Sequence, residues 1–294
     1  MIRTIFVLFA GIISISFAAI FIRFCDDVPS IMIATYRLSV ASLVLGSFYI
    51  FKGNRNTFGN IRRRDLLLCI AGGIFLALHF ITWISSLKYT SVASSVVLVT
   101  TNPIFVGVFS FLILKEKQNL ELVVGIILCF VGSVLIAVGD SGLTGLTVAD
   151  KNSLIGDVLA LVGAVMASGY LIIGSKARET VDIMAYVTVV FSVSAVFLLA
   201  TSLVLGISFT GYKESSYIFM ILLAIVPQLI GHTSINWALK HLKTSMVAIT
   251  ILGEPIGATI LAYVFFHETV KTIQFIGMVF VFAAIIVASR KGRR

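Results

Sequence analysis

Two ionisable side chains lie inside long apolar stretches of this 294-residue sequence, and they are its first candidates for chemistry. Glu254 stands about ten residues into one apolar stretch, and Arg37 stands about a third of the way into another, towards its outer side. A charge at the centre of a membrane-spanning helix costs about 2.5–3.5 kcal/mol, so such residues are functional candidates by default. Both are therefore candidates for a binding site within the apolar part of the protein.

Glu254 directly precedes Pro255, and this pair predicts a kinked, partly opened helix. Proline has no backbone N–H and frees the carbonyl of the residue four positions earlier, here Ile251. A carboxylate beside a free carbonyl can bind a cation, a substrate amine or a proton, and burial favours the protonated form of an unpaired Glu. The alternative is a polar contact that stabilises the kink. Asn102 and Pro103 repeat the arrangement with an amide, which can line a cavity or bridge two helices.

Arg37 has two interpretations. Its guanidinium can pair with a carboxylate or phosphate of a bound substrate. It can also be the structural partner of Glu254, or extend outward along the helix toward the membrane surface. An Arg37–Glu254 pair would satisfy both interpretations.

Two further stripes of polar and aromatic residues follow helical spacing, so each stripe shares one helix face. Polar side chains in lipid-embedded helices face protein or water, so both faces are predicted to point into the bundle. A histidine in such a stripe can relay protons near neutral pH or bridge helices, and a tryptophan can contact an apolar or cationic group or pack in the core. The first stripe contains His79, Trp83 and Ser86, and the second contains Gln228, His232 and Asn236 beside Pro227.

The composition indicates what must hold these residues in place. The chain is 59% hydrophobic and only 12% charged, with a mean hydropathy of +1.09. Soluble domains average about 45–50% apolar and about 25% charged residues. The sequence therefore excludes an ordinary soluble enzyme, a disordered chain and a fibrous protein, and it predicts an all-α integral membrane protein.

Ten apolar stretches are long enough to cross a bilayer, which needs about 20 residues each. They are continuously apolar rather than alternating, which indicates helices and not a barrel. The first could also be a secretory signal, because Arg3 precedes it and Ser16-Phe17-Ala18 resembles a cleavage site. The predicted spans are 4–24, 31–51, 66–87, 92–114, 120–139, 153–174, 184–206, 217–239, 245–266 and 272–289.

The basic residues predict the orientation. With a cytoplasmic N-terminus, 16 of the 22 Lys and Arg residues fall in inside segments and five in outside segments. Cytoplasmic loops carry such an excess, so both termini are expected in the cytoplasm, with the chain in the cytoplasmic (inner) membrane. The net charge of +9 comes from short clusters between apolar runs, so no nucleic-acid partner is expected.

Two acidic residues at the ends of the predicted helices are expected to have structural rather than functional roles. Asp157 is expected to cap the positive end of its own helix. Glu268 is expected to be a solvated loop acid that pairs with the nearby Lys271.

The second half of the sequence repeats the first at an offset of 152 residues. Asn102-Pro103-Ile104 aligns with Glu254-Pro255-Ile256, and Gly125 aligns with Gly277. Five spans per unit is an odd number, so the units enter the membrane in opposite directions and form inverted repeats. The predicted units are residues 4–139 and 153–290, joined by an outer linker at 140–152.

The paired patterns Asn-Pro-x(12)-Glu-x(8)-Gly in 102–125 and Gly-Glu-Pro-x(12)-Glu-x(8)-Gly in 253–277 resemble the EamA-type repeats of the drug/metabolite transporter superfamily. Thr35-Tyr36-Arg37 and Gly156-Asp157-Val158 fit the same resemblance. It implies that spans one to four and six to nine line a central cavity, with spans five and ten to the side, where they often support a homodimer. The superfamily carries amino acids, nucleotide-linked compounds, drugs and other metabolites.

The sequence therefore predicts a secondary transporter that moves a small organic metabolite by alternating access, by efflux or exchange, with proton coupling as an option. No cofactor, metal site or catalytic group is expected. Cys25, Cys69 and Cys129 show no metal-ligand spacing, which favours small buried side chains. The alternatives are an integral-membrane lipid-modifying enzyme and a channel or scaffold. The sequence shows neither the catalytic cluster that such an enzyme needs nor the charged filter that a channel usually needs.

Overall fold

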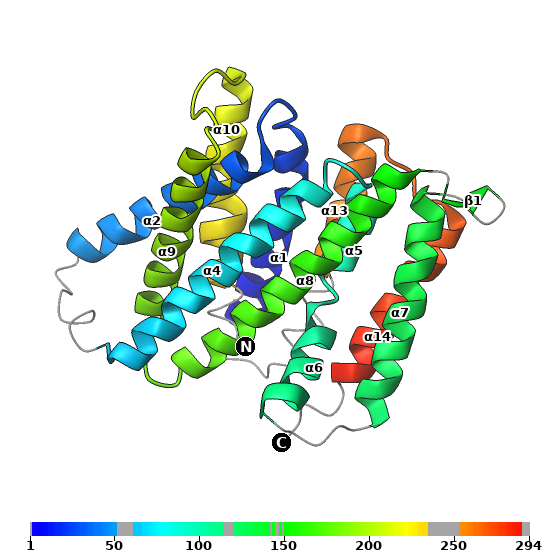
Figure 1. Ribbon diagram of the computed structural model, residues 1–294, viewed down its shortest axis with the longest axis horizontal. Coiled ribbons are helices and arrows are strands. Elements are labelled where there is room, and N and C mark those ends of the chain that lie inside the picture. The colour runs from blue at the N-terminus through cyan, green and yellow to red at the C-terminus, as the bar shows by residue number, and fades with distance from the viewer. Residues whose placement is uncertain are drawn as a thin grey trace.

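The computed structural model is an all-helical membrane protein and describes residues 2–51, 61–114, 120–141, 143–144, 147–148, 150–234 and 253–289 (Figure 1). Within these residues, seven helical stretches are long and apolar enough to cross a membrane, and three shorter apolar helices accompany them. The first half of the chain contributes α1 (Ile2–Arg23), α2 (Ser30–Phe51), α4 (Arg63–Ser86), α5 (Val92–Val99), α6 (Asn102–Leu114) and α7 (Leu120–Ser141).

The second half contributes a matching series of helices. Between the halves, where a linker was predicted, two-residue strands form an antiparallel pair with Leu143 opposite Val148. Among the described residues, this strand pair is the one departure from the all-α structure that the sequence predicts. The elements are β1 (Leu143–Thr144), β2 (Thr147–Val148), α8 (Lys151–Ala177), α9 (Ile183–Val204), α10 (Glu214–Leu223), the π-helix η1 (Ala224–His232), α13 (Gly253–Phe266) and α14 (Thr272–Ser289).

The segment predicted as one span over 92–114 is divided into α5 and α6. The Ser91 side chain caps the start of α5 by accepting a hydrogen bond from Ser94 N at 3.1 Å. Pro103 has no N–H to donate to the carbonyl of Val99, where α5 ends. Thr101 turns the chain, and its carbonyl accepts from Ile104 N at 2.9 Å as α6 begins.

The predicted span over 217–239 also departs from a regular α-helix. It begins as α10 and widens into η1, which contains Pro227. Proline removes one backbone donor, and single π-helical stretches inside helices often occur at functional sites. The wider turn changes the face that Gln228 and the residues after it present to their neighbours.

The helices of the two halves contact one another in matched pairs. α4 packs along α8, and α1 packs along α10 and η1. In the same way, α1 contacts α13 while α8 contacts α5 and α6, and α4 contacts α9 while α2 contacts α10 and η1. Two more contacts join equivalent helices directly, α2 with α9 and α7 with α14.

α7 and α14 form a layer of their own at one side of the bundle (Figure 1). Their crossing is close because Gly132 and Gly277 meet there. A Cβ built on either glycine would lie 2.7 Å from the carbonyl oxygen of the other. Small residues allow such close approach between membrane helices.

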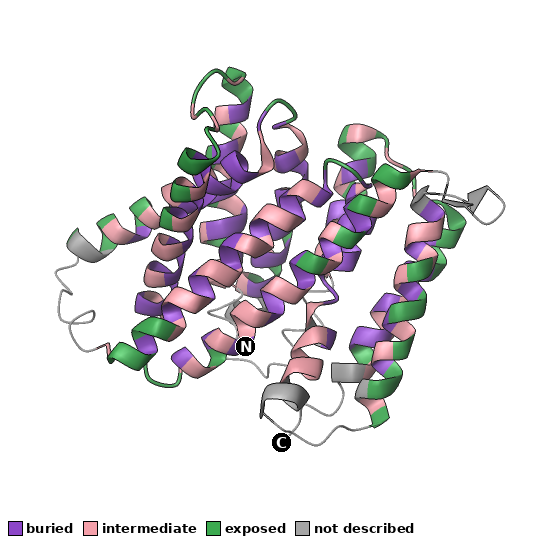
Figure 2. Ribbon diagram, viewed as in Figure 1, coloured by how far each residue is buried: buried purple, intermediate pink, exposed green. Residues whose placement is uncertain are grey.

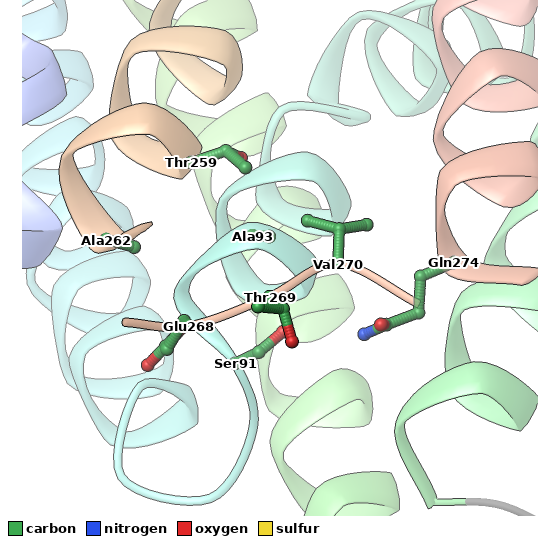
Figure 3. Close-up of a pocket in the computed structure, with 8 residues that line it drawn as sticks. All are labelled: Ser91, Ala93, Thr259, Ala262, Glu268, Thr269, Val270 and Gln274. Carbon is green, nitrogen blue, oxygen red and sulfur yellow. The ribbon is translucent and has the colours of Figure 1, made fainter. Parts of the chain in front are cut away.

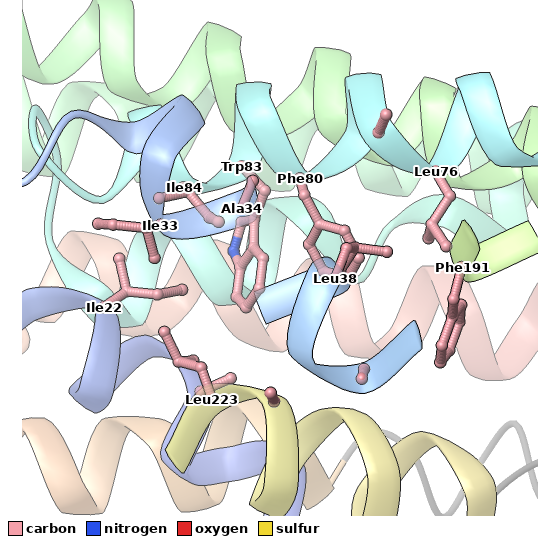
Figure 4. Packing of buried hydrophobic residues seen from close by; sticks show 14 of the residues in the cluster. Ile22, Ile33, Ala34, Leu38, Leu76, Phe80, Trp83, Ile84, Phe191 and Leu223 are labelled. Atoms are coloured by element: carbon pink, nitrogen blue, oxygen red, sulfur yellow. The ribbon is translucent and has the colours of Figure 1, made fainter. Parts of the chain in front are cut away.

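The buried and exposed apolar residues separate by position (Figure 2). Large apolar side chains such as Leu43, Leu203 and Phe275 are more than 60% exposed on the outer helix faces. Lipid tails are the solvent that suits such faces. Inside, Phe80 and Trp83 extend from α4 toward α2, where they form part of the main apolar core (Figure 4).

Candidate functional site

Arg37 of α2 is held at the centre of the protein by residues from two other helices. The side chain on α2 has no exposed surface, and its Nε donates to Gln228 Oε1 of η1 at 2.8 Å. The guanidinium carbon lies 4.2 Å from the ring centroid of Phe80 and 5.9 Å from the ring of Trp83, both on α4. Cation–π contacts of this kind stabilise a desolvated guanidinium. The Arg37 Nη1 atom is buried and has no hydrogen-bond partner among the described residues.

The first predicted stripe does point into the bundle. The rings of His79 and Trp83 are stacked, with centroids 6.0 Å apart and planes inclined by 9°. His79 Nδ1 lies 2.9 Å from the carbonyl oxygen of Gly163, so the imidazole also bridges α4 to α8. Trp83 is 4% exposed, and its Nε1 is buried with no hydrogen-bond partner in the described part of the chain.

Glu254 lies close enough to Arg37 for their charges to interact, but the two do not form an ion pair within 4.0 Å. The predicted partnership is therefore only a longer-range one, because Gln228 holds the guanidinium instead. Glu254 occupies the first turn of α13, and its carbonyl oxygen accepts from Ser16 Oγ of α1 at 3.4 Å.

The second stripe joins the same region. Gln228 is 1% exposed, and His232 interacts electrostatically with both Arg37 and His79. We call Arg37, His79, Phe80, Trp83, Gln228, His232 and Glu254 the central cluster. Asn236, the third residue predicted for this stripe, lies outside the described residues.

The structure places the other predicted residues at the starts of two helices. Asn102 begins α6, and its carbonyl oxygen accepts from Ser168 Oγ of α8 at 2.9 Å. None of its contacts in the described residues reaches the central cluster. Pro103 follows it in the first turn of α6, and Pro255 stands in the first turn of α13 as described. Ile251, whose carbonyl Pro255 would free, lies outside the described residues.

An open apolar hollow of about 240 Å³ lies between α2, α9 and η1, and no residue of the central cluster lines it. Leu45 of α2 and Leu229 of η1 contribute to its lining, together with Met184 of α9. Leu229 directly follows Gln228 in the chain, whereas Leu45 lies about 12 Å along α2 from Arg37.

Comparison with known sequences assigns the chain to a protein family. The profile of the EamA-like transporter family matches residues 2–138 and again residues 154–290. The chain belongs to the EamA-like transporter family.

Relatives of this EamA-like protein carry transporter names. The uncharacterized transporter YxxF of Bacillus subtilis (strain 168) is 25% identical over 269 residues, covering 91% of this chain and 84% of the relative. Solute carrier family 35 member G1 of Mus musculus is 25% identical over 260 residues, covering 86% and 69% of the two chains. A solved crystal structure of a protein, 16% identical, covers 99% of both chains with a TM-score of 0.65, which supports the fold.

The EamA-like protein also has a polar network at one end of the bundle. This end holds the α1–α2 turn, the α4–α5 turn, the α9–α10 loop and the α13–α14 connection, and we call it the α1–α2 end (Figure 1). Arg23 Nη2 donates to Glu268 Oε1 at 2.8 Å and to the carbonyl oxygen of Thr90 at 3.0 Å. Glu268 Oε2 accepts from Val92 N at the start of α5 at 2.9 Å.

Two expectations for acids at this end are wrong. Asp157 does not cap its own helix, because α8 begins earlier, and Asp150 caps it by accepting from Asn152 N. Asp157 instead accepts from Thr90 Oγ1 at 2.8 Å. Glu268 pairs with Arg23 rather than with Lys271, because the α13–α14 connection folds toward the end of α1.

A small polar cavity of about 10 Å³ lies beside Glu268 (Figure 3). Ser91, Thr259 and Gln274 line it together with Glu268. This volume is about what one water molecule requires. The α1–α2 end is therefore tightly packed here, with no room for a solute in this cavity.

Sequence reasoning missed Phe80, the residue closest to the guanidinium among the aromatic contacts. An apolar residue in an apolar run gives no signal of this role. Glu268 was noted as a loop acid, but nothing in the spacing of Arg23 and Glu268 predicts that they pair.

Proposed function

We propose that this protein is a secondary transporter that moves a small organic metabolite across the cytoplasmic membrane by alternating access. Two inverted five-helix units, residues 4–139 and 153–290, would tilt around the central cluster, with the linker at 140–152 between them. Net movement is efflux or exchange, coupled to protons through Glu254. The observation that carries the proposal is the buried polar cluster between the halves of an EamA-like chain.

The matched helix contacts support the inverted repeat. Exchanging each helix of one unit for its counterpart in the other turns the α1–η1 contact into the α8–α4 contact, and the α1–α13 contact into the α8–α6 contact. A pseudo-two-fold axis produces this exchange. Counting the three shorter apolar helices as spans gives ten.

The α1–α2 end is assigned to the outer side of the membrane. The excess of Lys and Arg in the loops of the opposite end favours this orientation, with both termini in the cytoplasm. Contacts across this end join the two units: Arg23 with Glu268, Thr90 with Asp157, and Lys213 with Asp26. In alternating access, such contacts must break when the outer side opens, so this arrangement corresponds to a state closed to the outside.

Glu254 is proposed as the proton carrier. It is an acid placed beside a fixed guanidinium without a close ion pair, so a proton can be gained or lost there without breaking a direct bond to Arg37. Ser16 holds the backbone of this turn through the Glu254 carbonyl.

The test is solute release from proteoliposomes. Vesicles are loaded with a defined mixture of amino acids, monocarboxylates, amines and nucleosides, and the loss of each is followed by mass spectrometry at pH 5.5–8. We expect wild type to release at least one class faster than protein-free vesicles, with a rate that changes with pH. Glu254→Gln should remove the pH dependence.

The matched control is Glu214→Gln, which changes an exposed acid at the start of α10. It should leave both the rate and its pH dependence as in wild type. If no class leaves the wild-type vesicles faster than the protein-free vesicles, the transport proposal is wrong. If Glu254→Gln keeps the wild-type pH profile, the coupling role of Glu254 is wrong.

A further inference from the structure

We propose that the central cluster binds the transported solute by a carboxylate, held between Arg37 Nη1 and Trp83 Nε1. The solute class is a small monocarboxylate with an apolar body. This inference rests on the proposed transport function and specifies its substrate.

Two buried donors in the central cluster have no acceptor in the described residues. Arg37 uses its Nε for Gln228, while its Nη1 is left without a partner. Trp83 Nε1 is likewise unpaired, and the Trp83 ring centroid lies 5.9 Å from the guanidinium carbon. Buried polar groups in native proteins are nearly always hydrogen-bonded, so two neighbouring unpaired donors indicate a missing acceptor.

The donors fit a carboxylate. A carboxylate has two oxygens that accept from two N–H groups, and an arginine gives charge-assisted bonds to such a group. Gln228 and Phe80 fix the guanidinium on its other sides, so the free Nη1 is oriented before the solute arrives. Such prior orientation reduces the entropy lost on binding.

The charges favour one negative charge on the solute. Arg37 of α2 and Glu254 of α13 carry the two formal charges of the central cluster, and His79 of α4 and His232 of η1 are its other titratable groups. When Glu254 is protonated, a monocarboxylate on Arg37 leaves the buried set neutral. A phosphate monoester brings a further negative charge that no described cation of the cluster balances, and uncompensated buried charge is costly.

The surroundings favour an apolar body of small size. The rings of Phe80 and Trp83 lie 4.2 and 5.9 Å from the guanidinium carbon, so the solute body beside the carboxylate would meet aromatic surface. Arg37 is fully buried and Trp83 is 4% exposed, which favours a solute of small size. A compact monocarboxylate with an apolar body therefore fits the two free donors and the aromatic rings beside them.

The experiment is calorimetric titration of the full chain in lipid nanodiscs with four probes: phenylacetate, phenylacetamide, 4-methylpentanoate and phenyl phosphate. At least one carboxylate should bind. Phenylacetamide should bind at least tenfold more weakly, because a bond to a charged group is worth roughly that factor. Phenyl phosphate should also bind more weakly than the carboxylates, because its further negative charge would be buried without a balancing cation.

Two variants test the anchor. Trp83→Phe removes the N–H and keeps an aromatic ring, so carboxylate affinity should fall roughly tenfold. Arg37→Gln should abolish carboxylate binding. Because this variant can fail to fold, Trp83→Phe tests carboxylate binding independently. The control Tyr186→Phe removes a hydroxyl from a buried ring on α9 and should bind carboxylates as wild type does.

The inference is overturned if no carboxylate binds, if phenylacetamide binds as well as phenylacetate, or if Trp83→Phe has wild-type affinity. These results leave the transport proposal standing whenever the loaded vesicles still release an amine, an amino acid or a nucleoside. Failure of all release by wild type removes the transport function itself, so the two failures are distinguishable.

Discussion

Arg23 at the end of α1 donates to Glu268 between α13 and α14 at 2.8 Å, across 245 residues of sequence. The pair is partly exposed, at 31% and 23%, so its ionic contribution alone is modest, about 0–1 kcal/mol. Glu268 also accepts from the backbone N–H of Val92, which adds a second bond between the halves. Losing both bonds should make it easier for the α1–α2 end to open.

Glu268→Ala should therefore raise the population of the open form by about fivefold, a change of about 1 kcal/mol. Spin labels placed at Tyr89 and Thr210, both exposed at this end, report the distance between the two halves. The labels require a background in which the three native cysteines are replaced. A longer distance should become more populated in Glu268→Ala than in wild type.

Glu214→Gln is the control for this measurement, because it removes an exposed charge at the same end. It should leave the distance distribution unchanged. An unchanged distribution in Glu268→Ala would show that this pair does not hold the end closed.

Gln228→Leu should destabilise the protein by about 1–3 kcal/mol, because it leaves the buried Arg37 Nε without an acceptor. Gln228→Glu keeps an acceptor at the same place and should be less destabilising. Thermal unfolding in detergent compares the two variants. Equal midpoints for Gln228→Leu and wild type would mean that another group accepts from Arg37.

Gly277→Ala should destabilise the α7–α14 crossing by about 1–3 kcal/mol through overpacking. The new methyl would lie 2.7 Å from the Gly132 carbonyl oxygen and 2.9 Å from Ile136 atoms. Gly46→Ala in α2 meets nothing within 4 Å and serves as the control, with an unchanged or higher unfolding midpoint. A stable Gly277→Ala protein would show that the two helices can separate without cost.

The Asp26–Lys213 pair should give a pH-dependent contribution to stability. The hydrogen bond from Lys213 lowers the pKa of Asp26 below its ordinary value of 3.8. A lowered pKa means that the contribution is present above about pH 3.8 and is lost as the pH falls through the lower, folded-state value. The unfolding midpoints of wild type and Asp26→Asn should therefore converge below pH 3.8, and a constant difference across pH 3–6 would contradict this.

The sequence predicted a helical membrane protein correctly, because hydropathy depends only on local composition. It also singled out Arg37, His79, Trp83 and Gln228, because polar residues at helical spacing stand out in apolar runs. It did not predict that Gln228 rather than Glu254 would hold the guanidinium. That choice depends on the rotation and crossing of α2 against η1, and the π-helical turn at Pro227 changes both.

The division of the predicted span at 92–114 shows the same limit. Pro103 was expected to produce a kink, but the position of a proline in the sequence does not say whether the helix bends there or ends. The turn at Thr101 lets α5 and α6 pack separately: both contact α8, and α5 also contacts α13. Such contacts involve residues far apart in the chain, which periodicity does not report.

Many bonds at the α1–α2 end run from a basic side chain to a main-chain oxygen. Lys88 donates to Val28, Arg23 to Thr90 and Lys271 to Gly139 in this way. An acceptor of this type is present whatever residue occupies the position. Homologues can therefore change the accepting residues as they diverge and keep these hydrogen bonds, provided that the basic donors persist.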